Sequence, residues 1–284
     1  MDKQRRKFLK IAGASVVAGI GAPAIIKLSS SPAFASGHAA PAADHSPAAD
    51  VHGGHADAHG AHAEEAPTGV RLGMVIDMRK MADNPGLLDN AISACIDAHN
   101  LPQFPDSKNA IKWIWKTPFE NVFTDHSAYH ASKKTAHIDF PALCNHCDDP
   151  PCCRACPTQA TFKVVSTGIV AMDFHRCIGC RFCMAACPYG ARSFNWQDPR
   201  PYIKKYNKNF PTRMKGVVEK CNFCGERLAL GQEPACVEAC KGTGAITFGN
   251  LNDAKSEVRA VLDKEFTIQR KPTLGTKPSV FYIV

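Results

Sequence analysis

Cysteine spacing constrains this chain more than any other feature, because twelve of its fourteen cysteines fall into three short runs. The middle run, 177–187, reads C-x2-C-x2-C-x3-C and is followed by Pro188, which is the spacing of bacterial iron–sulfur proteins. The other two runs read C-x2-C-x4-C-x3-C over 144–156 and C-x2-C-x11-C-x3-C over 221–240. Three such runs predict several 4Fe–4S clusters in one chain, and clusters held close together carry electrons. The members of the three runs are Cys144, Cys147, Cys152 and Cys156; Cys177, Cys180, Cys183 and Cys187; and Cys221, Cys224, Cys236 and Cys240.

The spacing within a run has a physical reason. Three cysteines separated by two residues let a tight loop surround one face of a cubane, and Gly179 allows the backbone to approach closely. The fourth cysteine of such a run ligates the other cluster of a pair. Pro157 and Pro188 each follow a fourth cysteine, where a fixed φ and a missing N–H turn the chain out of the site.

Two other cysteine chemistries compete with clusters. An exported chain rich in cysteine can be a disulfide scaffold, but such scaffolds are mostly short, and this chain has 284 residues with 45% hydrophobic composition. Paired C-x2-C units can bind zinc tetrahedrally, but zinc needs neither the third cysteine nor the trailing C-x3-C-P. A structural zinc or disulfide protein is therefore the disfavoured alternative.

The N-terminus predicts export. Arg5 and Arg6 are followed by Phe-Leu-Lys, the pattern of a twin-arginine (Tat) signal, and Ala33-Phe34-Ala35 forms an A-x-A cleavage site. The uncharged segment 11–26 is shorter than the roughly 20 residues of a membrane-spanning helix, although an uncleaved signal could still act as an anchor. We therefore expect 1–35 to be a Tat signal peptide and the protein to lie in the periplasm or on the outer face of the cytoplasmic membrane.

The net charge argues against nucleic-acid binding. Of the formal +8, the first 35 residues carry +5, which leaves +3 on the mature chain. A 4Fe–4S cluster with four thiolates carries about −2 when oxidised, so three clusters would make the loaded protein slightly negative. The chain also shows no basic stripe interleaved with aromatic residues.

Segment 36–69 is rich in Ala, His, Asp, Pro and Gly, and such a composition cannot bury a core. We interpret it as a flexible linker. Its six histidines follow no fixed spacing, which favours a solvated tether over a metal site. They are His38, His45, His52, His55, His59 and His62.

Residues 70–284 are expected to fold. The hydrophobic pattern predicts strands over 70–78, 111–116 and 121–124, a helix over 90–99, a hairpin over 162–172, an amphipathic helix over 252–265, and at 280–284 either an edge strand or a partner contact. Related tails follow each fourth cysteine, at 157–162, 188–194 and 241–248. This internal repeat indicates duplicated small cluster-binding units in which a short strand follows each helix.

The order of these motifs resembles the four-cluster, ferredoxin-type electron-transfer subunits of polysulfide reductase, formate dehydrogenase and DMSO reductase. The likeness covers essentially everything after the linker, and it is specific at 144–152, 177–180, 219–224 and 245–251. It implies an α+β fold of tandem bacterial-ferredoxin-like units with inserted strands. One unit is 140–200, with two clusters; the other is 70–139 with 201–284, degenerate and with a C-terminal extension.

The first motif departs from the family. Relatives carry a C-x2-C-x2-C-x3-C run after the opening strand, whereas here only Ala-Cys-Ile-Asp-Ala-His-Asn at 94–100 matches, so one cluster site is lost and Cys95 remains. The family's crossing rule then implies three 4Fe–4S clusters. The expected ligands are Cys144, Cys147, Cys152 and Cys187 (site 1); Cys177, Cys180, Cys183 and Cys156 (site 2); and Cys221, Cys224, Cys236 and Cys95 (site 3).

Two cysteines remain outside these sets. Cys153 adjoins the ligand Cys152 and is expected to be a buried free thiol. Cys240 would have served the lost cluster. In the competing assignment Cys240 closes site 3 and Cys95 is a core residue.

The resemblance also implies partners. In molybdenum-enzyme relatives the cluster of the first motif faces the catalytic subunit, so its loss here disfavours a molybdopterin partner at that place. The Tat signal and Thr212-Arg-Met-Lys-Gly-Val-Val-Glu-Lys-Cys are most similar to the periplasmic O subunits of sulfite-reductase-associated (Dsr) transmembrane complexes. That similarity implies a quinone-reactive integral membrane subunit of the polysulfide-reductase type and a periplasmic multihaem cytochrome c. The alternatives are a molybdopterin oxidoreductase, an exported hydrogenase or a nitrite reductase complex.

No catalytic constellation is recognisable, so a non-catalytic subunit is expected. His146 and His175 lie close to ligands and are expected to be solvated or supporting residues, and Asp148 and Asp149 to be exposed turn residues. Four basic residues flank cluster loops, where they either raise cluster potentials, meet an acidic partner or form an ordinary charged rim. They are Lys163, Arg176, Arg181 and Lys220.

Overall fold

A computed structural model describes residues 69–126 and 138–284. The predicted signal peptide, 1–35, and the linker up to residue 68 lie outside the described residues. None of the helices in the described part is both long enough and apolar enough to cross a membrane.

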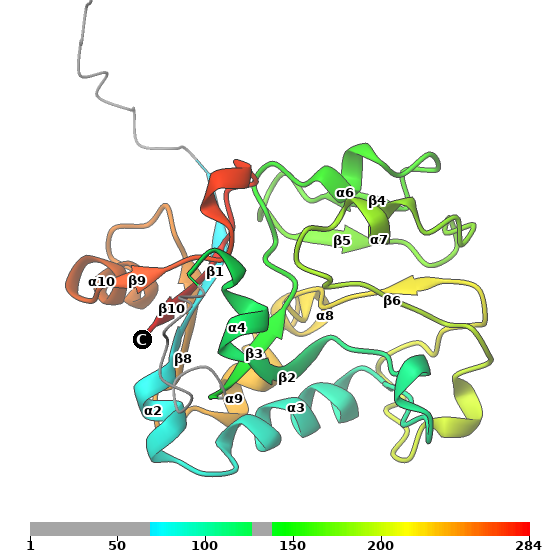
Figure 1. Cartoon of the computed structure of the whole chain (residues 1–284), viewed down its shortest axis with the longest axis horizontal. Helices are drawn as coiled ribbons and strands as arrows, with labels where there is room; N and C mark the ends of the chain where they lie inside the picture. Colours follow the sequence, from blue (N-terminus) through cyan, green and yellow to red (C-terminus); the bar gives the residue numbers. More distant parts are fainter. Residues whose placement is uncertain (1–68, 127–137) are drawn as a thin grey trace, which may run out of the picture. The chain divides into compact units, whose positions relative to one another are not determined.

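A four-stranded sheet joins the two ends of the described chain (Figure 1). The opening strand β1 (Leu72–Asp77) pairs parallel with β10 (Val280–Ile283) on one side and antiparallel with β8 (Ile246–Asn250) on the other. Strand β9 (Thr267–Ile268) completes the order β8-β1-β10-β9. The predicted opening strand is thereby confirmed.

The C-terminal strand is not at an edge, so that prediction was wrong in position. Residues 280–283 do form a strand, but β9 pairs with its outer side, and Val280 and Tyr282 are completely buried. The two-residue β9 is too short to be recognised from the sequence pattern, and it is what makes β10 an inner strand.

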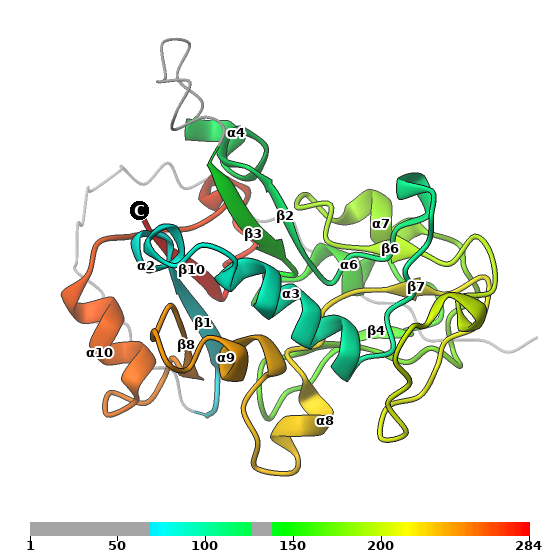
Figure 2. The same ribbon diagram turned by 90° about the horizontal axis from the view of Figure 1, so that it is seen from below.

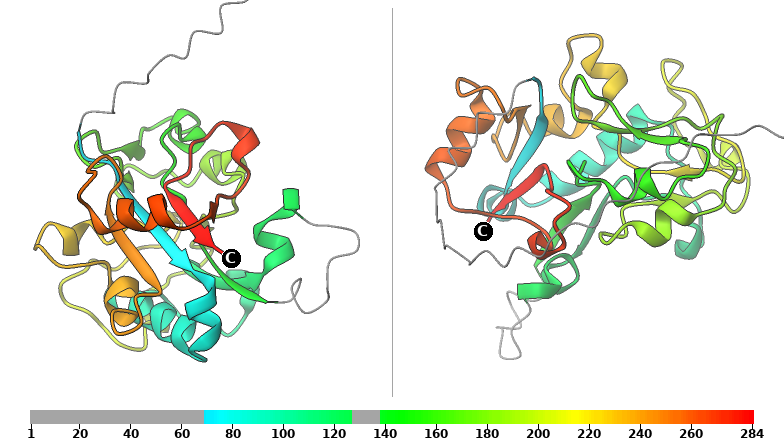
Figure 3. Two further views of the ribbon diagram at one scale, coloured as in Figure 1. Left: turned by 90° about the vertical axis from the view of Figure 1, so that its left-hand side faces the viewer. Right: turned by 90° about the horizontal axis from the view of Figure 1, so that it is seen from above.

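Successive residues of β1 face two different layers, as the twofold periodicity of a strand requires. Met74 and Ile76 point into the main core, whereas Val75 packs with Val258 and Ile283 beneath helix α10 (Glu257–Lys264). Figure 3 shows α10 lying across the strands of this sheet. The predicted helix over 252–265 is confirmed with a later start, at the Ser256 cap whose hydroxyl accepts from the Arg259 N–H at 3.4 Å.

Three two-stranded sheets complete the strand content of residues 69–126 and 138–284. They are β2 (Ile114–Pro118) with β3 (Asp139–Leu143), β4 (Thr161–Lys163) with β5 (Val170–Met172), and β6 (Ser193–Phe194) with β7 (Val218–Glu219). The hairpin predicted at 162–172 is confirmed as β4–β5. The tails that follow the three fourth cysteines give β4, β6 and β8, as the internal repeat predicted.

The strand predicted over 121–124 is wrong. Helix α4 (Phe119–Val122) occupies this segment and is followed by a 3-10 turn, η2 (Thr124–His126). A helical turn places Phe119 and Phe123 on one face, with ring centroids 5.1 Å apart, and both pack against Phe140. Val122 and Phe123 are neighbours in sequence and both are buried. A helical turn can bury both, whereas successive residues of a strand point to opposite faces.

The longest helix of the described residues, α3 (Leu87–Ala98), packs against α9 (Ala235–Ala239), so two segments far apart in sequence lie side by side (Figure 2). It confirms the helix predicted over 90–99. The mixture of short helices and strands accords with the predicted α+β class. The remaining helical elements are α2 (Met78–Asp83), α6 (Pro151–Arg154), α7 (Phe182–Ala186), α8 (Gly225–Leu228), η1 (Ser107–Asn109), η3 (Arg200–Tyr202) and η4 (Pro272–Leu274).

Candidate iron–sulfur centres

All fourteen cysteines lie in the described residues, and every one of them is a free thiol. Most are buried, and the others are half-buried. The predicted ligands are therefore unpaired thiols, most of them shielded from solvent.

Site 3 brings together Cys95 from α3 and cysteines from the α8–α9 region. Burial raises the pKa of the Cys95 thiol well above its usual range, and nearby thiolates raise it further. Those thiolates belong to the three cysteines expected to share its cluster: Cys221, Cys224 and Cys236.

Cys240, the competing fourth ligand, is completely buried at the end of α9. Burial alone raises the pKa of Cys240 to about 11. Its thiolate acts on Cys236, whose pKa burial raises to about 12 with further contributions from Cys221 and Cys240. Cys95 thus lies near the three remaining members of site 3 and Cys240 lies near Cys236, so Cys95 stays the expected fourth ligand and Cys240 the competing one.

Site 1 unites the first cysteine run with the end of α7. Burial raises the pKa of Cys147 to about 12, and the thiolates of the other expected ligands add to this effect. They are Cys144, Cys152 and Cys187. Cys187 comes from the middle run, so a cysteine of a second run lies near Cys147, and the crossing of ligands between runs stays a prediction.

Fewer of the expected ligands of site 2 interact with one another. Burial raises the pKa of Cys183, and the thiolates of Cys152 and Cys177 contribute to the increase. The places of Cys156 and Cys180 in this set rest on spacing. Burial would raise the pKa of Cys156, but hydrogen bonds from the Thr161, Thr158 and Ala160 backbone and from the Thr158 side chain lower it.

Cysteines of site 1 lie close to cysteines of both other sites. Burial raises the pKa of Cys221 of site 3 above its usual range, and the Cys144 thiolate of site 1 raises it further. On the other side, the Cys152 thiolate of site 1 acts on Cys183 of site 2. These neighbours favour an order in which site 1 connects sites 2 and 3.

Backbone N–H groups point at the sulfurs of site 3. The Phe223 N–H donates to Cys221 Sγ at 3.5 Å, and the Ala235 N–H donates to Cys224 Sγ at 3.3 Å. Donors of this kind stabilise negative charge on a thiolate. Convergent buried thiols with backbone donors fit a 4Fe–4S cluster, and the four cysteines of each site would hold it.

A buried cation that the sequence analysis missed lies between sites 1 and 2. The Arg192 side chain is only 6% exposed and its Nη1 donates to Thr161 Oγ1 at 3.0 Å. Burial alone would lower the pKa of Arg192, but thiolates of both sites raise it, namely those of Cys152, Cys183 and Cys144. The only sequence signal was a basic residue within the otherwise small and apolar tail at 188–194.

Lys220, which the sequence did single out, is also buried rather than part of a solvated rim. Its Nζ donates to the Cys221 carbonyl at 2.8 Å and to the Val170 carbonyl. By contrast, Arg176 is exposed, and the Arg181 guanidinium lies over the Trp196 ring at 4.7 Å. Lys220 therefore belongs with Arg192 among the cations that lie close to the sites.

A second missed feature is a histidine–carboxylate pair at site 3. His99, which is buried, lies with Nδ1 3.6 Å from Cys95 Sγ and Nε2 2.8 Å from Glu226 Oε1. Burial would raise the pKa of Glu226, but the hydrogen bond from His99 lowers it. Ligand atoms of His99, Glu226 and Cys224 lie within 4.8 Å of one another, so the pair sits at the edge of the thiol site.

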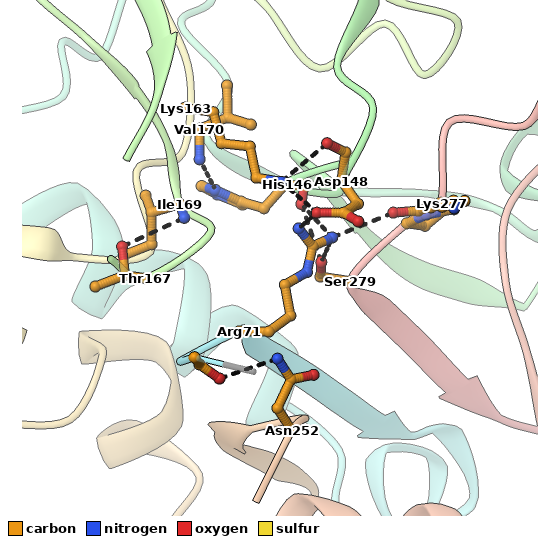
Figure 4. Close-up of polar contacts among 12 residues, drawn as sticks. Arg71, His146, Asp148, Lys163, Thr167, Ile169, Val170, Asn252, Lys277 and Ser279 are labelled. Atoms are coloured by element: carbon orange, nitrogen blue, oxygen red, sulfur yellow. Dashed lines mark hydrogen bonds and ion pairs between the residues drawn. The ribbon is translucent and has the colours of Figure 1, made fainter. Parts of the chain in front are cut away.

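The loop of the first run is fastened to the sheet through Arg71 (Figure 4). Its Nη2 donates to Ser279 Oγ at 2.5 Å and to the His146 carbonyl at 3.3 Å, and its Nη1 pairs with Asp148. His146 accepts from the Val170 N–H at 3.2 Å through Nδ1. The loop that presents Cys144 and Cys147 is thus tied to both β10 and β5.

His146 is completely buried, so a solvated role is ruled out and the supporting role remains. Its ring stacks on Phe223 at 3.6 Å, and burial followed by the nearby Lys220 charge lowers its pKa well below the usual range. Asp148 and Asp149 are exposed, as expected of turn residues, and His175 is exposed, in keeping with the solvated role.

Cys153 is half-buried rather than buried. Its side chain hydrogen-bonds to Cys152, which lowers the pKa of Cys152 to about 5. The neighbouring thiol thus supports the thiolate form of a predicted site 1 ligand.

Comparisons with known proteins agree with this geometry. A family model described as a 4Fe–4S dicluster domain matches residues 135–202 and 201–251. The chain is 44% identical over 201 residues to the Hdr-like menaquinol oxidoreductase iron–sulfur subunit 1 of Archaeoglobus fulgidus, covering 67% of this chain and 71% of the relative. It is 33% identical to the menaquinone reductase iron–sulfur cluster-binding subunit of Nitratidesulfovibrio vulgaris, over 75% and 89% of the two chains.

It is also 35% identical to Protein NrfC of Escherichia coli, over 76% of this chain and 81% of the relative. The chain belongs to the family of ferredoxin-type iron–sulfur electron-transfer subunits. Its expected role as an electron-transfer subunit, not a catalytic one, is confirmed. The match to a 4Fe–4S dicluster domain indicates that the chain binds 4Fe–4S clusters. A bound cluster of this kind takes up and releases single electrons.

Proposed function

We propose that the protein is an exported subunit with three 4Fe–4S clusters that passes electrons between a quinone-reactive membrane subunit and a periplasmic multihaem cytochrome c in a Dsr-type sulfur-metabolism complex. The membrane partner would be of the polysulfide-reductase type. In this proposal the ligands are those of sites 1 to 3, with Cys95 closing site 3.

The observation that carries the proposal is the row of three thiol sites with only Cys95 left from the first motif. Loss of that motif removes the site that faces a molybdopterin subunit in the relatives that the sequence resembles. If site 3 is the last cluster of the row, the partner beside site 3 would be an electron-transfer protein and not a molybdopterin subunit.

The quinone-linked part has separate support from the relatives' printed names, which include a menaquinol oxidoreductase and a menaquinone reductase. Arg5, Arg6 and the A-x-A site support export before assembly with these partners. The described residues supply the thiolates, the backbone donors and the buried cations that would hold each cluster and set its potential.

Affinity purification of the full-length chain from its native membranes, under anaerobic conditions, tests this proposal. We expect mass spectrometry to identify an integral membrane quinone-reactive subunit and a multihaem cytochrome c, and we expect a menaquinol analogue to reduce the iron–sulfur signals of the complex. Co-purification with a molybdopterin catalytic subunit, an exported hydrogenase or a nitrite reductase instead would replace the Dsr-type assignment with that alternative.

A further inference from the structure

The surface over site 3 carries an open groove of about 510 Å³ between α3 and α9. Its floor contains small residues that flank the cysteines of site 3 in the two helices. They are Ala94 and Ala98 around Cys95, and Ala235 and Ala239 around Cys236. Since a methyl group is the largest side chain at these four positions, a partner can approach the site closely.

One wall of the groove is formed by a basic segment, 199–217, that contains no Asp or Glu. Lys205, Tyr206 and Lys208 of this segment line the groove. The six basic residues of the segment are Arg200, Lys204, Lys205, Lys208, Arg213 and Lys215.

The two acidic side chains in the groove are already neutralised. Asp97 pairs with Lys205 at 2.9 Å, and Glu238 pairs with Arg227. Lys204 and Lys208 are exposed and make no ion pair with any residue that the structure describes. The unpaired charge of this surface is therefore positive.

The basic segment is held rigidly against the helix that carries Cys95. Asn100 and Asn207 bond reciprocally: the Asn207 N–H donates to Asn100 Oδ1 at 2.7 Å, and Asn100 Nδ2 donates to the Asn207 carbonyl at 2.9 Å. Asn207 Nδ2 also donates to the Ala98 carbonyl at 2.7 Å, and Arg213 Nη1 to the His99 carbonyl at 2.6 Å. A surface fixed in this way loses little entropy when a partner binds.

We propose that this groove is the docking surface for an electron-transfer protein whose own surface is acidic around its redox centre. Charge complementarity selects that occupant, because the unpaired lysines would attract an acidic surface and steer its approach. In the proposed function site 3 is an end of the row of clusters, so a partner that docks beside it could exchange electrons with the chain there. The inference rests on the proposed function and specifies which end meets which kind of partner.

Stopped-flow reduction of the complete, cluster-loaded protein by reduced flavodoxin, a small acidic electron-transfer protein, tests the inference. The groove variant is Lys204→Glu with Lys208→Glu, and the matched control is Lys255→Glu with Lys264→Glu, which makes the same charge change at exposed positions near α10. We expect the groove variant to react about tenfold more slowly at low salt and to lose its salt dependence, whereas the control follows the wild type.

Equal rates in the wild type and the groove variant would overturn the inference, as would an equal loss in the control. Retained flavodoxin rates together with lost binding to vesicles of anionic phospholipid would assign the surface to a membrane instead, and a lost dimer would assign it to a second copy of the chain. Iron content and reduction by dithionite are measured on the same samples. If the wild type lacks iron or is not reduced by dithionite, the proposed function is contradicted. A change in the flavodoxin rate alone bears only on the groove.

Discussion

Arg192 is expected to set the potentials of sites 1 and 2, and replacing it by methionine tests this expectation. The guanidinium is buried, and the thiolates that raise its pKa belong to both sites. Reduction adds a negative charge to a cluster, so a fixed cation beside it favours the reduced form. Arg192→Met should therefore lower the midpoint potentials of both clusters and leave the site 3 potential in place.

The magnitude follows from Coulomb's law. For one added electron centred about 7 Å from the guanidinium, with an effective dielectric constant of about 20, the interaction is about 2 kcal/mol. Since about 1.4 kcal/mol corresponds to about 59 mV for a one-electron couple, the expected shift is about 80 mV downward at each site. Arg192 is almost fully buried, so solvent screening reduces this value little.

The assay is an anaerobic redox titration followed by EPR, with Arg192→Lys as the matched control. The lysine variant keeps the charge but loses the planar fork, so its potentials should stay near those of the wild type. A merely structural role would disturb both variants alike. Unchanged potentials in Arg192→Met, or an equal shift at all three sites, would refute the reasoning.

Other substitutions separate the remaining assignments. Cys95→Ser should remove one cluster, seen as the loss of about four irons per chain, whereas Cys240→Ser should keep all of them; the reverse pattern would transfer the fourth ligand of site 3 to Cys240. Gly179→Ala should destabilise the site 2 loop strongly, because its φ is +71° and a Cβ there would overlap the Gly216 carbonyl. Gly190→Ala, at φ +63° with open space around it, should cost only about 1–2 kcal/mol of unfolding free energy in a denaturant titration, and equal costs would contradict the steric argument. Glu219→Gln should lower the free energy of unfolding by about 3–5 kcal/mol, because it leaves the buried Arg213 side chain without its counter-ion. A loss below about 1 kcal/mol in a urea titration would contradict this.

The cysteine geometry was the most predictable part of the molecule. Ligand spacing is local, and the ferredoxin loop directs its fourth cysteine to the other cluster. The proximity of Cys147 and Cys187 could therefore be expected from the cysteine runs. Cys95 was proposed because residues 94–100 match the end of the family's first motif, although the other cysteines of that motif are missing here. Its thiolate neighbours now support that choice, which remains a proposal until irons are counted.

The groups that surround the clusters could not be predicted in the same way. Arg192 and His99 act on sites whose cysteines come from other segments, and no local periodicity relates them. The inner position of β10 depends on the two-residue β9, and α4 depends on packing between Phe119 and Phe123. Each of these features is decided by long-range packing, which overrides local pattern.

Chemical analysis of anaerobically purified full-length protein is the most direct test of three clusters held by twelve thiolates. We predict about twelve irons and about twelve acid-labile sulfides per chain, with interacting signals in the EPR spectrum of the reduced protein. About four irons or fewer per chain, or stoichiometric zinc in their place, would contradict the account.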